Sequence, residues 1–306
     1  MTPLRSINPA ESGEIATAPQ VQSPLGELPD KPLVTIQRGT GWRAVDLKEL
    51  WQFRELLYFL TWRDVKVRYK QTAIGVVWIV LQPLLMTLTF SVLFGRLARV
   101  PSDGVPYPLL AFSGLLPWTF FSSALLTASN SLVGHAYMIT KVYFPRMIIP
   151  GAAVAGRVID LLVSFAAFTV LMIYYGVQFT PRMFLIPVLV LLTALFALGV
   201  GMWTSAMNVK YRDIGVALPI VTMLWMFASP VVYPSSLVYD HVRRPLWRFV
   251  YTLNPLVGII DNFRAALFGM PFNWPALIST VVITMVLLMY SAYEFKRMER
   301  GFADIV

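Results

Sequence analysis

Long apolar stretches separated by short polar segments dominate the chain from residue 73 onward. Six of them approach the roughly 20 residues that an α-helix needs to cross about 30 Å of hydrocarbon. They run over residues 74–95, 107–128, 147–175, 183–207, 214–233 and 274–293. The pattern predicts an all-α integral membrane protein whose region 73–306 is a domain of six transmembrane helices.

The stretch 249–268 is apolar enough to suggest a seventh span, but it contains polar and charged side chains and is divided by Asn254-Pro255. The two halves are too short to cross a membrane. We expect a re-entrant hairpin on the extracytoplasmic side, because irregular backbone at membrane depth is tolerated where protein surrounds it.

Positive charge fixes the predicted topology. With six spans and an inner amino terminus, inner segments from Arg54 onward hold twelve Lys and Arg residues, and outer segments hold seven. This asymmetry obeys the positive-inside rule. A seventh span would move Lys296, Arg297 and Arg300 outside. Six spans with both termini in the cytoplasm are therefore expected.

Two segments precede the spans. Residues 1–41 contain six prolines and no periodic apolar pattern, which predicts a flexible cytoplasmic tail without a signal peptide. In region 42–72, Asp46 and Glu49 resemble a capping box ahead of apolar residues interleaved with charges. This pattern predicts an amphipathic helix at the membrane surface. A soluble helix packed on a partner protein is the alternative.

Composition supports the membrane assignment. Charged residues make up 13% of the chain and hydrophobic residues 57%, whereas about 25% of a soluble domain is charged. In a membrane protein the net charge of +9 reflects topology and anionic lipid headgroups rather than a nucleic-acid partner. The absence of cysteine and the presence of only two histidines argue against a metal site.

No catalytic motif is found. None of the eighteen glycines precedes a lysine, as a P-loop would require. Gly-x-Ser-x-Gly, His-Glu-x-x-His and Asp-x-Asp are also absent from the sequence. We therefore expect no enzyme centre, metal or cofactor in this chain.

Two predicted cytoplasmic loops combine aromatic and charged residues, as a surface for a cytosolic partner would. An ordinary basic loop anchored by interfacial aromatic residues is the alternative for the first. The candidates are Tyr137, Thr140, Lys141, Tyr143, Pro145 and Arg146 in the first loop, and Tyr211, Arg212 and Asp213 in the second.

Polar and aromatic residues within the predicted spans offer two further candidates. Arg157 and Asp160 stand three residues apart and so share a helix face, where they predict an intramembrane ion pair that is either functional or purely structural. Aromatic faces could stack on sugars along a channel, with packing or an interfacial belt as the alternative. The candidate channel-lining residues are Trp78, Gln82, Trp118 and Phe121.

Several short motifs then occur in a characteristic order. They are Arg68-Tyr69-Lys70-Gln71-Thr72 with Gln82-Pro83-Leu84, Gly114-Leu115-Leu116-Pro117-Trp118, Lys141-Val142-Tyr143-Phe144-Pro145-Arg146, Tyr211-Arg212-Asp213, Ser229-Pro230-Val231, and Asn254-Pro255-Leu256 with Phe263-Arg264. From about Leu50 to the end, the chain resembles the permease subunits of type-2 ABC exporters for polysaccharides, O-antigen, teichoic acids and polyol phosphates.

The resemblance implies a homodimer in the bacterial cytoplasmic (inner) membrane, docked on two separate ABC ATPase subunits that bind ATP and Mg. It implies export of a lipid-linked glycan among membrane lipids. Residues 137–146 would contact the ATPase, and Arg68 and Lys70 would meet the substrate's phosphate headgroup. An ABC exporter of a lipid or drug and an ATPase-independent secondary transporter remain alternatives.

Overall fold

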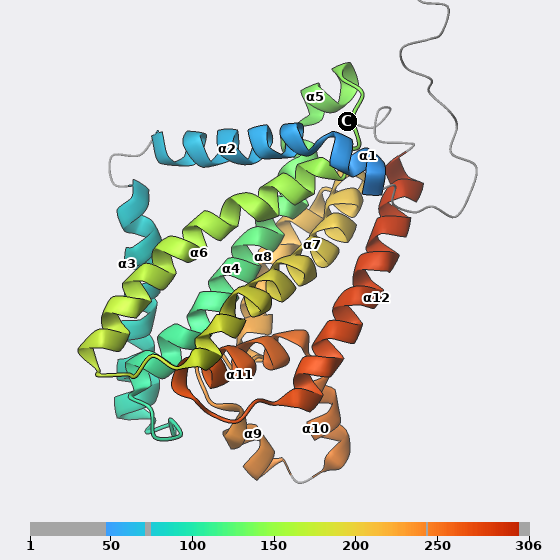
Figure 1. The fold of residues 1–306 in the computed structure, drawn as a ribbon. Helices are drawn as coiled ribbons and strands as arrows, with labels where there is room; N and C mark the ends of the chain where they lie inside the picture. The colour runs from blue at the N-terminus through green and yellow to red at the C-terminus, as the bar shows by residue number, and fades with distance from the viewer. Residues whose placement is uncertain (1–46, 71–74, 243, 300–306) are drawn as a thin grey trace, which may run out of the picture. The chain divides into compact units, whose positions relative to one another are not determined.

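A computed structural model describes residues 47–70, 75–242 and 244–299. All regular elements in these ranges are helices, which confirms the predicted all-α class (Figure 1). The predicted tail 1–41 lies outside the described residues. The α-helices are α1 (Leu47–Gln52), α2 (Arg54–Lys70), α3 (Gly75–Phe90), α4 (Tyr107–Gly134), α5 (Ala136–Lys141), α6 (Ile148–Tyr174), α7 (Ile186–Lys210), α8 (Asp213–Phe227), α9 (Ser235–His241), α10 (Pro245–Thr252), α11 (Pro255–Phe268) and α12 (Trp274–Glu299). A π-helix, η1 (Ser91–Leu97), continues α3, and a 3-10 helix, η2 (Pro181–Leu185), precedes α7.

Five helical segments are long and apolar enough to cross a membrane: Val77–Leu97, Tyr107–Gly134, Ile148–Tyr174, Pro181–Lys210 and Trp274–Glu299. They correspond to five of the six predicted spans. The sixth, 214–233, corresponds to α8, which has 15 residues. At 1.5 Å per residue α8 is about 22 Å long, shorter than the roughly 30 Å hydrocarbon core. That α8 crosses the membrane stays a prediction.

The ambiguous stretch 249–268 falls on two helices. The eight-residue α10 ends at Thr252 and the fourteen-residue α11 begins at Pro255. The break is at Asn254-Pro255, because proline suits the first turn of a helix but not its interior. Entry of this helix pair into the membrane stays a prediction.

The central helix is α4. Its side chains are mostly buried, and it packs along α6 and α7 and also contacts α3, α8 and α11. An added Cβ on Gly201 of α7 would stand 2.7 Å from the Cβ of Ala128 on α4. Only glycine permits this close approach, which is typical of packed membrane helices.

One end of the bundle is formed by α5 with α1 and α2, and the other by α9, α10 and α11; we call them the α5 end and the α9 end (Figure 1). Helix α2 packs on α6, where Leu60 is buried and Val65 lies next to Gly156. Its outward side exposes Tyr58 and Phe59, which lie on the same helix as several cations. The position of α2 at a membrane surface stays a prediction.

Candidate functional site

The α5 end joins the two predicted partner-binding loops through a common apolar core. This core contains Ile139 and Phe144 from the first loop and Val209 from the end of α7, together with Ala292 and Phe295 of α12. Buried anchors alternate with side chains that face outward. The exposed fractions of Tyr137 and Tyr143 are 74% and 71%. The first loop is therefore a fixed support that presents aromatic groups to the surroundings.

Of the remaining candidates in the first loop, some are exposed and others attach the loop to the rest of the chain. The Lys141 ammonium lies 4.5 Å from the ring centre of Tyr137, in a cation–π contact. Arg146 instead donates from Nη1 to the Glu299 carbonyl oxygen at 2.6 Å, which links the loop to the end of α12. Thr140 is in α5, and Pro145 is half-buried. Lys141 is thus part of the exposed surface of the loop, whereas Arg146 also attaches the loop to the end of α12.

The second loop is held by an asparagine. Tyr211, Arg212 and Asp213 are exposed at the junction of α7 and α8. Beneath them, Asn208 Nδ2 donates to the carbonyl oxygen of Ser129 on α4 at 3.1 Å, and Asn208 Oδ1 accepts from the Gly215 amide at 3.0 Å. Sequence reasoning missed Asn208, although a buried amide at the end of an apolar span is a detectable signal. Its bonds tie the first turn of α8 to α4.

Near the α5 end lies a charge cluster centred on Asp160, which we call the Asp160 cluster. The Asp160 carboxylate accepts from Arg68 Nη1 at 2.7 Å, from the Tyr69 hydroxyl at 2.6 Å and from Arg157 Nη1 at 3.0 Å. Arg157 also donates to Thr127 Oγ1 from Nη2 at 2.7 Å. The predicted pair of Arg157 and Asp160 is therefore present, within a network that joins α2, α6 and α4.

The cluster is partly enclosed, with side-chain exposures of 15% for Asp160 and 26% for Arg68. Burial, and then the hydrogen bond to Asp160, raise the pKa of the Tyr69 hydroxyl above its ordinary value. The hydroxyl of Tyr69 is protonated and donates to the Asp160 carboxylate. Two guanidinium groups, of Arg68 and Arg157, contact the Asp160 carboxylate. Lys70, the other predicted headgroup cation, is exposed at the end of α2.

The four predicted channel-lining residues fall into two environments. Trp78 and Gln82 are exposed on α3, on the outside of this single chain. Phe121 is instead fully buried, stacked on Phe196 at 5.1 Å and edge-on to Trp225 at 5.3 Å. Trp118 is also buried. Trp118 and Phe121 are thus packed against other helices of the same chain. A channel-lining role for these four residues stays a prediction.

At the α9 end, three of the sequence motifs converge on one buried guanidinium. Arg264 of α11 donates to the carbonyl oxygens of Leu110 at 3.0 Å, Val231 at 2.9 Å and Tyr233 at 3.1 Å. An added Cβ on Gly114 would stand 2.3 Å from the Val231 oxygen. We call this arrangement the Arg264 junction. It explains how Gly114, Ser229-Pro230-Val231 and Phe263-Arg264 depend on one another.

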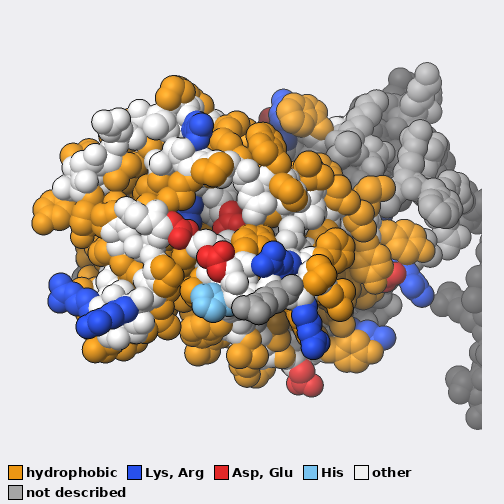
Figure 2. All heavy atoms as spheres, turned by 90° about the horizontal axis from the view of Figure 1, so that it is seen from below, with side chains coloured by type: hydrophobic (Ala, Val, Ile, Leu, Met, Phe, Trp, Pro, Cys, Tyr) orange, Lys and Arg blue, Asp and Glu red, His pale blue; other side chains and the backbone are white. Residues whose placement is uncertain are grey.

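A neighbouring asparagine connects α8 to α11. Asn254 Oδ1 accepts from the Leu256 amide at 3.1 Å, which caps α11, and also from Trp225 Nε1 of α8 at 3.1 Å. Its amide nitrogen donates to Ser229 Oγ at 3.0 Å. Around these helices, charged side chains of both signs gather on the face of the α9 end (Figure 2).

Comparison with known proteins gives the family. Residues 55–268 match the model of the ABC-2 type transporter family. The chain is 31% identical over 263 residues to the O-antigen export system permease protein RfbA of Myxococcus xanthus, covering 85% of this chain and 98% of that protein. It is 26% identical to RfbA of Klebsiella pneumoniae, covering 82% and 95%. It is 23% identical to the polysialic acid transport protein KpsM of Escherichia coli, covering 76% and 91%.

The matched region begins in α2 and ends with α11. It therefore contains the Asp160 cluster, both exposed loops of the α5 end and the Arg264 junction. The chain belongs to the ABC-2 type transporter family.

Proposed function

We propose that this chain is the permease subunit of an ATP-driven exporter that carries a lipid-linked polysaccharide, of O-antigen, capsule or teichoic-acid type, across the bacterial inner membrane. The activities named for its relatives, O-antigen export and polysialic acid transport, support this substrate class. The observation that carries the proposal is the α5 end, where two loops distant in sequence present exposed aromatic and charged side chains on a shared apolar core.

In this proposal the α5 end and both termini are cytoplasmic. Two separate ABC ATPase subunits bind ATP and Mg and contact Tyr137, Lys141 and Tyr143, together with the 211–213 turn. A second copy of the chain completes a homodimer with the channel at its axis. The outward apolar side chains of α3 and α8 support further contacts with a second copy or with membrane lipids.

The contacts suggest how ATPase closure reaches the spans. Force on the first loop passes to α12 through Arg146 and Glu299, and force on the second passes to α4 through Asn208. The Asp160 cluster links α2 to α6. The guanidinium groups near this cluster, with Lys70 at the end of α2, suit a phosphate or pyrophosphate headgroup that enters near the cytoplasmic surface.

The first test is purification of the tagged chain from its native membrane in mild detergent, with the accompanying proteins identified by mass spectrometry. An ABC ATPase in equimolar amount is expected. If none is present, and the purified chain alone supports transport in vesicles, the protein is a secondary transporter instead. If a lipid or drug stimulates the ATPase activity of the complex and a lipid-linked glycan does not, the substrate is a lipid or drug, and the proposed polysaccharide substrate is wrong.

Charge reversal tests the docking surface. Lys141→Glu should strongly reduce export and substrate-stimulated ATPase activity while the chain remains folded, because Lys141 is exposed. Arg96→Glu, which reverses an exposed cation outside the two loops, is the matched control and should leave both activities unchanged. Full export and ATPase stimulation in Lys141→Glu would contradict the assignment of the first loop.

A further inference from the structure

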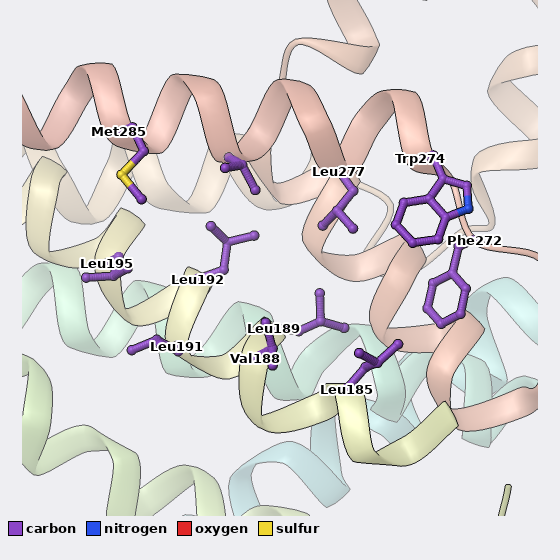
Figure 3. A pocket seen from close by; sticks show the side chains of 11 residues that line it. Leu185, Val188, Leu189, Leu191, Leu192, Leu195, Phe272, Trp274, Leu277 and Met285 are labelled. Atoms are coloured by element: carbon purple, nitrogen blue, oxygen red, sulfur yellow. The ribbon is translucent and has the colours of Figure 1, made fainter. Parts of the chain in front are cut away.

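A wholly apolar groove lies between α7 and α12 (Figure 3). Its lining comes mainly from the first halves of both helices, which are nearest the α9 end (Figure 1). Its volume is about 380 Å³, and its lining includes Val188, Leu189 and Leu192 of α7 and Trp274, Leu277 and Met285 of α12. Farther along, the same helices touch where Gly199 faces Leu287. The groove is therefore a local separation of two packed spans.

The side chain of Arg182 is held beside this groove. Arg182 of η2 donates from Nη1 to the carbonyl oxygens of Gly269 at 2.6 Å and Met270 at 2.9 Å. Its guanidinium carbon lies 5.9 Å from the ring centre of Phe272, which lines the groove. Among the described residues, no acceptor is bonded to Nε or Nη2 of Arg182. These donors remain available to a ligand.

The surrounding sequence offers no counter-charge. Residues 176–199 and 269–293, which contain the groove and its mouth, include no Asp or Glu. An exposed guanidinium therefore stands next to a hydrocarbon-lined hollow without a carboxylate from either segment. A phosphate group attached to a hydrocarbon chain complements both features, because guanidinium groups bind phosphate strongly and the hollow accepts only apolar matter.

We propose that this groove binds an acyl chain of a membrane phospholipid whose phosphate is held by Arg182. An empty hollow would leave its lining atoms without dispersion contacts, which a lipid chain from the bilayer restores. The bound lipid fills the space between α7 and α12 on the side of the α9 end.

The test uses the full chain, purified with its accompanying subunits and then delipidated. The complex is titrated with dioleoyl phosphatidylglycerol or with dioleoyl phosphatidylcholine. Native mass spectrometry counts the bound lipid molecules. The wild type should retain phosphatidylglycerol in preference to phosphatidylcholine. Arg182→Gln should reduce phosphatidylglycerol retention about fivefold, the effect of one cation near anionic lipid. Val188→Trp should abolish retention by filling the groove.

Two matched controls separate this site from general lipid contact. Arg96→Gln removes another exposed cation, and Val170→Trp enlarges a valine of α6 that is 67% exposed, against 59% for Val188. Both should bind lipid as the wild type does. Equal phosphatidylglycerol retention by Arg182→Gln, Val188→Trp and the wild type would overturn the proposal. Retention of undecaprenyl phosphate in preference to phosphatidylglycerol by the wild type, lost in Val188→Trp, would identify the lipid carrier as the occupant and also overturn the proposal.

Discussion

At the scale of single residues, Arg264 shows how a buried charge is retained without an ion pair among the described residues. Its guanidinium is satisfied by three backbone carbonyls, two of them in the turn that follows α8. The Val231 and Tyr233 carbonyls lie in the non-helical turn after α8, and the Leu110 carbonyl lies in α4. One side chain thus ties this turn to α4.

Gly114→Ala should destabilise the protein by about 1–3 kcal/mol, since the new methyl group would collide with the Val231 oxygen and with Arg264. Thermal unfolding in detergent measures the change. Gly134→Ala, at the other end of the same helix with no atom near the added methyl group, should cause no loss. Equal stability of the two variants would contradict the packing described for the Arg264 junction.

Asp160→Asn should lower the free energy of unfolding by about 2 kcal/mol, less than the roughly 3–5 kcal/mol for a fully buried pair, because two guanidinium groups lose their shared carboxylate. Limited trypsin digestion should also cut α2 faster. Glu294→Gln removes a carboxylate whose partner Arg297 is 71% exposed. That control should change stability by no more than about 0.5 kcal/mol, and a similar loss in both variants would refute a special role for the Asp160 cluster.

At the scale of elements, α8 is the helix that connects the two ends of the bundle. Its first turn is bonded to Asn208, and its last turn is bonded through Trp225 to Asn254. Most of its apolar side chains, such as Val216 and Leu224, are exposed. The helix is therefore fixed by polar contacts at its ends more than by packing along its length.

Asn254→Ala should cost about 1–2 kcal/mol, because it removes the cap of α11 together with the bonds to Trp225 and Ser229. Hydrogen exchange of the amides in the first turn of α11 should accelerate. Gln178→Ala, in the exposed loop after α6, serves as the control and should leave exchange in α11 unchanged. Unaltered exchange in Asn254→Ala would show that the cap is dispensable.

At the scale of the whole molecule, the described helices place different elements at the two ends. The α5 end carries the exposed aromatic loops and α2, whereas the α9 end carries three short helices around Arg264. Five long spans separate them. An ATPase that acts at one end must therefore work through rigid helices to affect the other.

The orientation can be tested directly because the chain contains no cysteine. In spheroplasts, a membrane-impermeant maleimide should label Asp240→Cys but should label Tyr143→Cys only after permeabilisation. Both positions are exposed, at the α9 end and the α5 end respectively. The unmodified chain provides the blank. Labelling of both variants from the same side would reject the proposed topology.

The sequence alone determined the class, the long spans and the break at Asn254-Pro255. These features depend on local composition and on the missing amide hydrogen of proline. Both have the same effect in any tertiary arrangement. The pair of Arg157 and Asp160 was also predictable, because residues three apart on a helix share a face. The helix α8 ends at Phe227, before the end of the predicted 214–233 stretch, and whether that stretch spans the membrane stays a prediction.

Only the tertiary structure decided which distant residues meet. Arg68 joins Asp160 across 92 positions, and Arg264 reaches Leu110 across 154. The aromatic residues Trp118 and Phe121 could line a channel or fill a core on sequence grounds, and the helices around α4 placed them in the core. The groove beside Arg182 likewise could not be predicted from one segment of the sequence, because residues 185–195 and 272–285 line it together. Long-range contacts depend on how helices cross, and crossing depends on small residues such as Gly201 in several spans at once.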